Sequence, residues 1–228
     1  MNTNAMLDEE TRRVFREDWA VAHDAIAREV RRVITWTKAR QRAYAQTLVA
    51  LTRSPDDNQR GIASGILEEL IEYDPALLPV SNLVEMAEEG QWPVKTSAAV
   101  CFFQLACASP GVVPIDTVVK LILDGDWYIT TPALNTLKIL ASTRPAAIAA
   151  LQMLAEHEDA EIRELVASAL NHIVDHDPAV VPRDTLVKLS EDRHKATRTI
   201  AEEALERWDN LGLSEEDIAD AYTPCSPF

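Results

Sequence analysis

DPALLPVSNLVEMAEEGQWPVKTSAAVCFFQLA, residues 74–106, is followed within three residues by SPGVVPIDTVVKLILDGDWYITTPALNTLKILA, residues 109–141. The two stretches share a pattern of two prolines, a glycine and a tryptophan. These recur at a separation of 35 residues: Pro75 with Pro110, Pro79 with Pro114, Gly90 with Gly125, and Trp92 with Trp127. A fixed period between about 20 and 50 residues is the signature of stacked structural repeats. The sequence therefore predicts a repeat architecture.

The composition favours a helical, globular chain. Of the 228 residues 47% are hydrophobic and 26% charged, and only 6 are Gly. The net charge of −15 disfavours nucleic acid and anionic membranes, because phosphate binding needs clustered cations. The N-terminus has no apolar signal core, and no run of about 18 apolar residues could span a bilayer. We therefore expect a cytoplasmic protein that does not bind membranes.

The cysteines indicate a reducing environment. Cys101 and Cys107 lie in an apolar helical run, and the third, Cys225, lies near the C-terminus. An odd number of cysteines does not suggest a disulfide framework. We expect Cys101 and Cys107 to be buried free thiols.

Apolar spacing and helix-end residues divide the chain into three parts. Residues 1–40 form an N-terminal helical segment, with one long helix or two shorter ones in 8–40. Residues 41–212 form five antiparallel pairs of a first helix, A, and a second helix, B. We expect the A helices at 41–53, 80–89, 115–123, 146–156 and 183–190, and the B helices at 57–73, 93–107, 128–143, 160–175 and 195–209. Residues 213–228 form a short capping helix and a disordered tail.

Prolines, glycines and acids mark the helix ends. Pro79, Pro114 and Pro182 precede A helices, where proline is best tolerated. Gly90 and Gly125 follow A helices and are expected in the left-handed conformation. A ladder of mostly basic residues occurs one turn into the B helices, at Arg60, Lys95, Thr130, Arg163 and Arg198. Four residues earlier stand Asp56, Gln91, Asp126, Asp159 and His194, of which the aspartates can cap the helices. We expect each cation to bond its own cap aspartate or that of the neighbouring repeat.

The B helices resemble the HEAT-repeat family and the related armadillo repeats. The best match is EDAEIRELVASALNHIVDHDP, residues 158–178, with an acid, a basic residue and then small and apolar residues. The resemblance covers about residues 41–210. It implies an all-α, right-handed α-α superhelix of about five helix pairs, and a non-enzymatic scaffold or adaptor that binds another protein. The architecture alone does not identify the partner, and the sequence does not indicate the oligomeric state.

In such a solenoid the B helices line the concave face, so the outward residues of successive B helices are the candidate partner-binding residues. Phe103 is the expected apolar anchor, because aromatic residues dominate binding energy at interfaces. The other candidates follow from the repeat period or adjoin Phe103: Gln104, Asn135, Lys138, Ser168, Asn171 and Glu206.

Two alternatives use other residues. Arg28, Arg31 and Arg32 belong to a basic segment, 28–42, that could bind nucleic acid or an acidic partner, or dock on the acidic solenoid itself. QWPVKTSAAV and DWYITTPALN resemble the Trp-containing helices of HEAT-like alkylpurine DNA glycosylases, although the second has Thr130 in place of the basic residue. The acidic charge argues against that activity, and we expect Trp92 and Trp127 to be packed. Steeply salt-dependent DNA binding would favour the alternative.

No residue pattern indicates catalysis or a cofactor. The chain has no Ser-centred elbow, no glycine-rich phosphate loop and no Cys-x-x-Cys motif. His172 and His176 are four residues apart on one helix, a spacing that two metal ligands can use. No third ligand follows from the spacing, so we expect no metal site.

Overall fold

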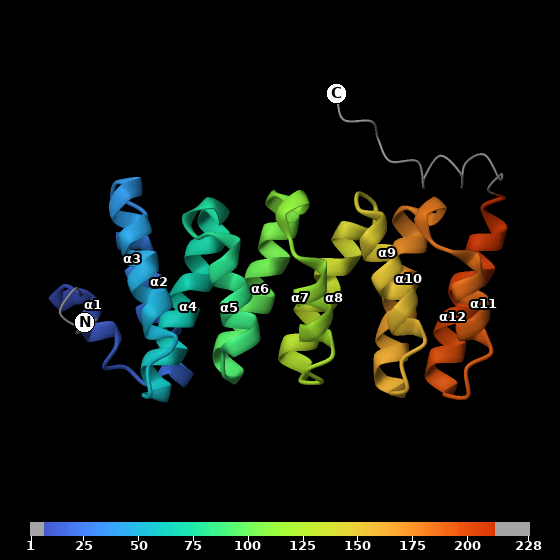
Figure 1. Cartoon of the computed structure of the whole chain (residues 1–228), viewed down its shortest axis with the longest axis horizontal. Coiled ribbons are helices and arrows are strands. Elements are labelled where there is room, and N and C mark those ends of the chain that lie inside the picture. The colour runs from blue at the N-terminus through green and yellow to red at the C-terminus, as the bar shows by residue number, and fades with distance from the viewer. Residues whose placement is uncertain (1–6, 213–228) are drawn as a thin grey trace, which may run out of the picture.

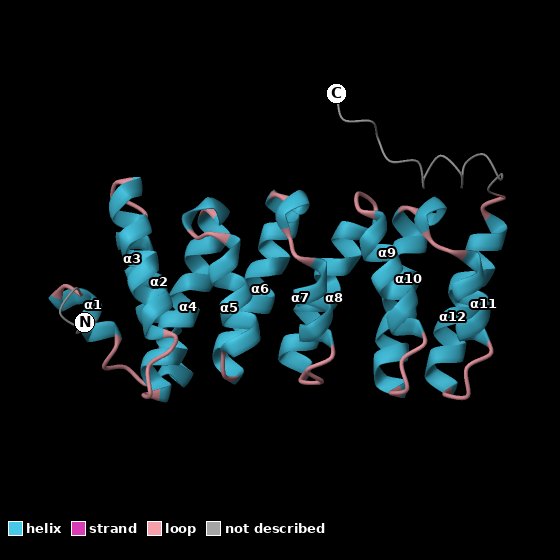
Figure 2. Cartoon of the chain, viewed as in Figure 1, coloured by secondary structure: helices cyan, strands magenta, loops and turns pink. Residues whose placement is uncertain are grey.

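The computed structural model describes residues 7–212, and its helices stand side by side in a row from the N-terminal to the C-terminal end (Figure 1). Within this range no strand occurs, and short loops join the helices (Figure 2). The prediction of an all-α repeat solenoid is therefore confirmed. The expected capping helix and tail, 213–228, and Cys225 lie outside the described residues.

The five helix pairs form two layers. The A helices are α3 (Lys38–Leu51), α5 (Val80–Glu89), α7 (Ile115–Ile122), α9 (Pro145–Ala155) and α11 (Arg183–Ser190). The B helices are α4 (Asp57–Tyr73), α6 (Trp92–Ala108), α8 (Trp127–Ala141), α10 (Ala160–His176) and α12 (Lys195–Asn210). Each A helix packs on its B partner, and each B helix packs on the next B helix. The predicted limits of these helices are correct to within three residues.

The B helices bury the same apolar face in every repeat. One position is fully buried and small in nearly every repeat: Ala63, Ala98, Ala133, Val166 and Ala201. A second position is buried and large: Leu70, Leu105, Leu140, Ile173 and Trp208. Small side chains let two helix axes approach to about 8–10 Å, and the large ones fill the space beside the contact. The repeats are therefore joined by a single hydrophobic core.

The N-terminal segment extends the B layer. It contains α1 (Glu9–Val14), a 3-10 turn η2 (Trp19–Val21) and α2 (His23–Val33), so the expectation of two shorter helices holds. Helix α2 packs against α4. The Asn58 amide holds the chain between α1 and η2, because it accepts a hydrogen bond from Trp19 N at 2.8 Å and donates one to Glu17 O at 2.7 Å. The domain limits at residues 40 and 212 remain predictions.

The connection between the third and fourth pairs differs from the others. A 3-10 turn precedes α5, α7 and α11: η3 (Pro75–Leu77), η4 (Pro110–Val112) and η5 (Pro178–Val180). Between α8 and α9 there are only residues 142–144. Arg144 ties this short connection to the preceding one by donating to Pro110 O at 3.1 Å and Val113 O at 2.6 Å. Helices α8 and α10 pack less extensively on each other than α6 and α8, or α10 and α12.

The expected cap residues and the basic residues one turn into the B helices are present, with one difference in their bonding. Asp56, Asp126 and Asp159 cap their B helices, whereas Gln91 and His194 do not. The cations cross to the next repeat at three positions: Arg60 donates to Gln91 at 2.7 Å, Lys95 to Asp124 at 2.5 Å, and Arg163 to Asp192 at 2.6 Å. The aspartates in these pairs lie two residues before the cap position, so the prediction that the cap aspartate itself is bonded was wrong.

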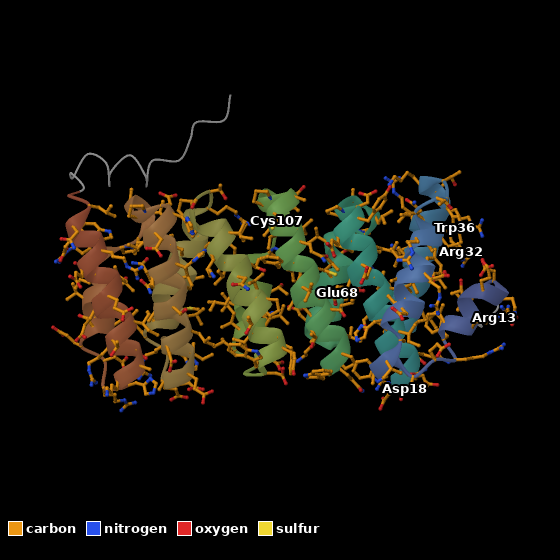
Figure 3. All side chains as sticks on the ribbon, turned by 180° about the vertical axis from the view of Figure 1, so that it is seen from behind. Arg13, Asp18, Arg32, Trp36, Glu68 and Cys107 are labelled. Carbon is orange, nitrogen blue, oxygen red and sulfur yellow. The ribbon has the colours of Figure 1, made fainter. Side chains whose placement is uncertain are left out.

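Two local predictions were wrong. Gly125 is left-handed as expected, with φ +82°, but Gly90 is extended, with φ −70° and ψ 152°. Gly90 is required for space instead, because a Cβ would lie 2.1 Å from the carbonyl oxygen of Met86. Cys101 is buried, whereas Cys107 is exposed at the end of α6 (Figure 3).

The ion pair between Arg163 and Asp192, which joins the last two repeats, gives a testable prediction. Hydrogen bonds from Arg163 lower the pKa of the Asp192 carboxyl from 3.8 to about 2, and both side chains are at least nine-tenths buried. We expect Asp192→Asn to lower the free energy of unfolding by about 2 kcal/mol at pH 7, because one pKa unit corresponds to about 1.4 kcal/mol. Since the folded-state pKa is the lower one, the stabilisation is present above pH 4 and is lost as the pH falls toward 2.

Urea unfolding at pH 7, 4 and 3 measures this difference. Glu156→Gln is the matched control, because it removes a carboxylate from the exposed pair with Lys188, and it should leave the unfolding midpoint nearly unchanged. Equal effects of the two substitutions, or a difference that does not shrink in acid, would contradict the assignment.

Candidate functional site

Three of the predicted partner-binding residues line one groove on the B-helix face. Phe103 of α6 and Asn135 and Lys138 of α8 face each other across a hollow of about 450 Å³. The remaining lining residues are Ile139, Ser142, His172, Ile173 and His176. We call this hollow the Phe103 groove. It lies over α6, α8 and α10, where α8 and α10 pack less extensively than the other neighbouring B helices.

The other predicted residues on this face lie outside the groove lining. Ser168 and Glu206 are exposed. Asn171 is half-buried and accepts a hydrogen bond from Arg207. Gln104 is half-buried beside Phe103, and its Oε1 has no hydrogen-bond partner among the described residues. The structure therefore places Phe103, Asn135 and Lys138 together in one groove. The remaining candidates on this face, Gln104, Ser168, Asn171 and Glu206, lie outside its lining.

The Phe103 groove combines apolar and basic groups. Its carbon surface comes from Phe103, Ile139 and Ile173, and its lining includes no carboxylate from the described part of the chain. The Lys138 ammonium donates to Asn135 Oδ1 at 3.1 Å and, within residues 7–212, forms no ion pair. Burial lowers the pKa of Lys138. A chain with a net charge of −15 thus has a locally basic hollow.

Two histidines lie at the edge of the groove. The rings of His172 and His176 stack edge to face, with centroids 4.6 Å apart. Burial lowers the pKa of His172 first, and the charges of Lys138 and His176 lower it further, while Asp175 opposes them. Nothing in the sequence connected these histidines with Lys138, because the contact crosses from α8 to α10.

A row of aromatic side chains at the start of the B helices was not predicted. Trp92 is 42% exposed, Trp127 63% and Tyr128 64%, so the expectation that both tryptophans are packed was wrong. The Trp92 ring lies 6.2 Å from Trp19 and 5.7 Å from Tyr128, centroid to centroid, and its Nε1 donates to Asp126 at 2.9 Å. The exposure of the two tryptophans could have been predicted from the repeat period. The equivalent positions carry Asp57, Ala160 and Lys195 in the other repeats, which is typical of a surface position.

The three arginines of the basic segment have different environments. Arg28 and Arg31 are exposed and form no ion pair in the described part of the chain. Arg32 is engaged internally: it donates to Glu29 at 2.7 Å and to Asp8 at 2.8 Å, near Trp36 (Figure 3). The binding of a partner or of nucleic acid by these residues stays a prediction.

The cluster around Arg32 holds the N-terminal helices together. Glu29 is 3% exposed and also accepts a hydrogen bond from the Tyr44 hydroxyl at 2.9 Å, which joins α2 to α3. Burial would raise the pKa of Asp8, but hydrogen bonds from Arg32 and Thr11 lower it to about 2. Arg32 therefore has a structural role at the junction of α1, α2 and α3.

Between residues 7 and 212 no group of three or more His, Cys, Asp or Glu side chains is arranged to hold a metal ion. In the same range no helix is both long and apolar enough to cross a bilayer.

Lys138 and His172 give a prediction for the groove. We expect Lys138→Gln to raise the pKa of His172, because it removes a positive charge that disfavours the imidazolium. The change is measured by NMR titration of the His172 ring protons. Lys188→Gln, which removes a cation from the A-helix face, should not move that pKa. An unchanged His172 titration in Lys138→Gln would contradict the described groove.

Comparison with known proteins identifies the fold. No protein-family model matches the chain, and no curated protein sequence matches it significantly. An engineered protein of known structure has a TM-score of 0.51 and 20% identity, covering 90% of this chain and 98% of that one. A designed armadillo repeat protein in complex with the peptide (KR)4 has a TM-score of 0.51 and 15% identity, covering 88% and 98%.

A natural protein is also similar. Importin beta has a TM-score of 0.58 and 13% identity, covering 81% of this chain and 28% of importin beta, so the chain spans little more than a quarter of its length. At these identities the similarity establishes architecture alone. The chain has the fold of a HEAT/armadillo-like α-solenoid.

Proposed function

We propose that the chain is a non-enzymatic scaffold that binds a segment of another protein, with the Phe103 groove as its main contact. The observation that carries this proposal is the groove itself. It joins apolar surface, the amide of Asn135 and the Lys138 ammonium, which has no ion pair among residues 7–212, on the face formed by the B helices. A few convergent polar groups on an apolar hollow are typical of binding sites.

Phe103 is more accessible to a partner than the adjacent Phe102. Phe102 is completely buried in the core, whereas Phe103 is half-buried and lines the groove. A partly exposed aromatic side chain at the centre of a hollow has the environment of an interface hot spot. The basic lining favours a partner segment with an acidic or polar residue next to an apolar one.

The architecture is compatible with peptide binding. One protein of similar fold is a designed armadillo repeat protein in complex with a peptide. That similarity supports the ability of such a fold to hold a chain segment.

The test is the effect of Phe103→Ala on partner capture. The wild-type chain and the Phe103→Ala variant are each used as bait in affinity capture, and the captured proteins are compared by quantitative mass spectrometry. Each captured protein is then purified, and its affinity for the two forms of the chain is measured by titration. We expect at least ten-fold weaker binding, because hot-spot truncations cost about 2 kcal/mol or more. The thermal midpoint should change by only a few degrees.

Met153→Ala is the matched control, because Met153 is an apolar side chain that is 55% exposed on α9, outside the groove. It should leave binding unchanged. A large fall in the melting temperature of Phe103→Ala would assign Phe103 to the core, and unchanged capture would rule out the groove as the contact.

A further inference from the structure

The basic side chains that line the Phe103 groove are not neutralised by carboxylates of the described chain. The lining contains one ammonium, Lys138 of α8, and two imidazoles, His172 and His176 of α10. Among residues 7–212 none of the three forms an ion pair, and Lys138 donates a hydrogen bond to Asn135 Oδ1 at 3.1 Å. A carboxylate from outside therefore meets one cation and two groups that donate hydrogen bonds through ring N–H.

The other charged groups near this lining do not cancel its basic character. Of helix α6, Phe103 lines the groove, and no titratable side chain from the described part of α6 does so. On α10, Asp175 acts on His172, but it accepts hydrogen bonds from Arg207 of α12 at 2.9 and 3.2 Å. In the connection after α8, Arg144 donates to two backbone carbonyl oxygens. The basic groups of the lining itself therefore set the charge of the groove.

His172 holds a proton weakly in the free chain. Burial lowers its pKa first, and the charges of Lys138 and His176 lower it further, while Asp175 opposes them. The rings of His172 and His176 lie edge to face, with centroids 4.6 Å apart, so a proton on one ring disfavours a proton on the other. Because an ordinary histidine has a pKa of about 6.5, His172 is mostly neutral at pH 7.

A carboxylate in the groove has the opposite effect on these histidines. A negative charge within about 4–6 Å of an imidazole favours its protonated form. Lys138 and the two histidines line the same hollow of about 450 Å³, so one carboxylate can approach all three. Positive charges that repel one another in the free groove are then stabilised by a common anion.

We propose that the Phe103 groove binds an acidic side chain of a partner segment together with a proton, which the pair of His172 and His176 takes up from water. The carboxylate lies between Lys138 and the histidines, and an apolar residue next to it packs on Phe103. This inference rests on the proposed function of the groove and adds its regulation. The affinity for an acidic segment rises as the pH falls from 7.5 to 5.5, and the gain ends near pH 4, where a glutamate carboxylate itself takes up a proton.

Two peptides test this linkage between binding and protonation. Both are eight-residue Gly/Ser peptides with blocked ends, and they differ only in a central Leu-Glu or Leu-Gln pair. Binding to the ¹⁵N-labelled chain is followed at pH 7.5, 6.5 and 5.5 by the side-chain amide signals of Asn135 and the ring protons of His172. We expect the Glu peptide to bind three- to ten-fold more tightly at pH 5.5 than at pH 7.5, because a rise of one unit in the pKa of one histidine corresponds to ten-fold. The affinity of the Gln peptide should not rise.

Calorimetry measures the proton directly. The Glu peptide is titrated into the chain at pH 6.5 in two buffers that differ in their enthalpy of ionisation. We expect the binding enthalpy to depend on the buffer with the sign of proton uptake for the Glu peptide, and to be independent of the buffer for the Gln peptide.

Substitution of the histidines separates their role from that of Lys138. His172 and His176 are exposed, so the double variant His172→Gln/His176→Gln should keep its melting temperature. We expect it to bind the Glu peptide with an affinity that does not change between pH 7.5 and 5.5, while Lys138 still favours Glu over Gln. His23→Gln is the control, because His23 is an exposed histidine at the start of α2, outside the groove. It should keep the full dependence on pH.

The proposal would be overturned by equal pH dependence of the Glu and Gln peptides, or of the double variant and His23→Gln. Absence of proton uptake, or of any binding of the Glu peptide at pH 5.5, would also overturn it. Failure of the proposed function gives a different result, namely unchanged partner capture by Phe103→Ala. If instead both peptides bind independently of pH and Phe103→Ala abolishes their binding, the groove remains the contact and the proton linkage alone is wrong.

Discussion

The burial of one face of every B helix in the shared core is the constraint on which the rest of the structure depends. At the small position of this face, Ala98 and its equivalents are completely buried, so the packed helices meet with little side chain between them. Packing of each B helix on the next one fixes the distance between repeats. Everything else follows from that distance, including the reach of Lys95 and Arg163 to the next A–B loop.

The Phe103 groove lies where the regular packing of the B helices changes. The connection after α8 is shortened to residues 142–144, and α8 and α10 pack less extensively on each other than the neighbouring pairs of B helices. The Phe103 groove lies over these helices and has Lys138 in its lining.

Much of the fold could be predicted from the sequence because its signals are local. Proline before the A helices, aspartate before the B helices and the period of 35 residues place the helix limits to within three residues. Gly90 shows the limit of such rules, since its role is to avoid contact with Met86 rather than to adopt a left-handed conformation. The candidate site was less predictable. Its residues Phe103, Asn135 and Lys138 could be predicted from the repeat period, but its histidines could not.

The histidines beside Lys138 depend on how two B helices separate, which no spacing encodes. Arg32 similarly meets Asp8 through a fold-dependent contact, over a separation of 24 residues. The exposed tryptophans were predictable in principle from the polar residues at the equivalent positions of other repeats.

The most direct test of this close packing is the free energy of unfolding of Ala98→Leu, compared with that of Ala50→Leu. Ala50 is an exposed residue near the end of α3. The account predicts that Ala98→Leu lowers the free energy of unfolding by about 1–3 kcal/mol, because the added atoms force closely packed helices apart, while Ala50→Leu changes it by less than about 0.5 kcal/mol. Equal, small effects of the two substitutions would contradict the close packing of the B helices in the core.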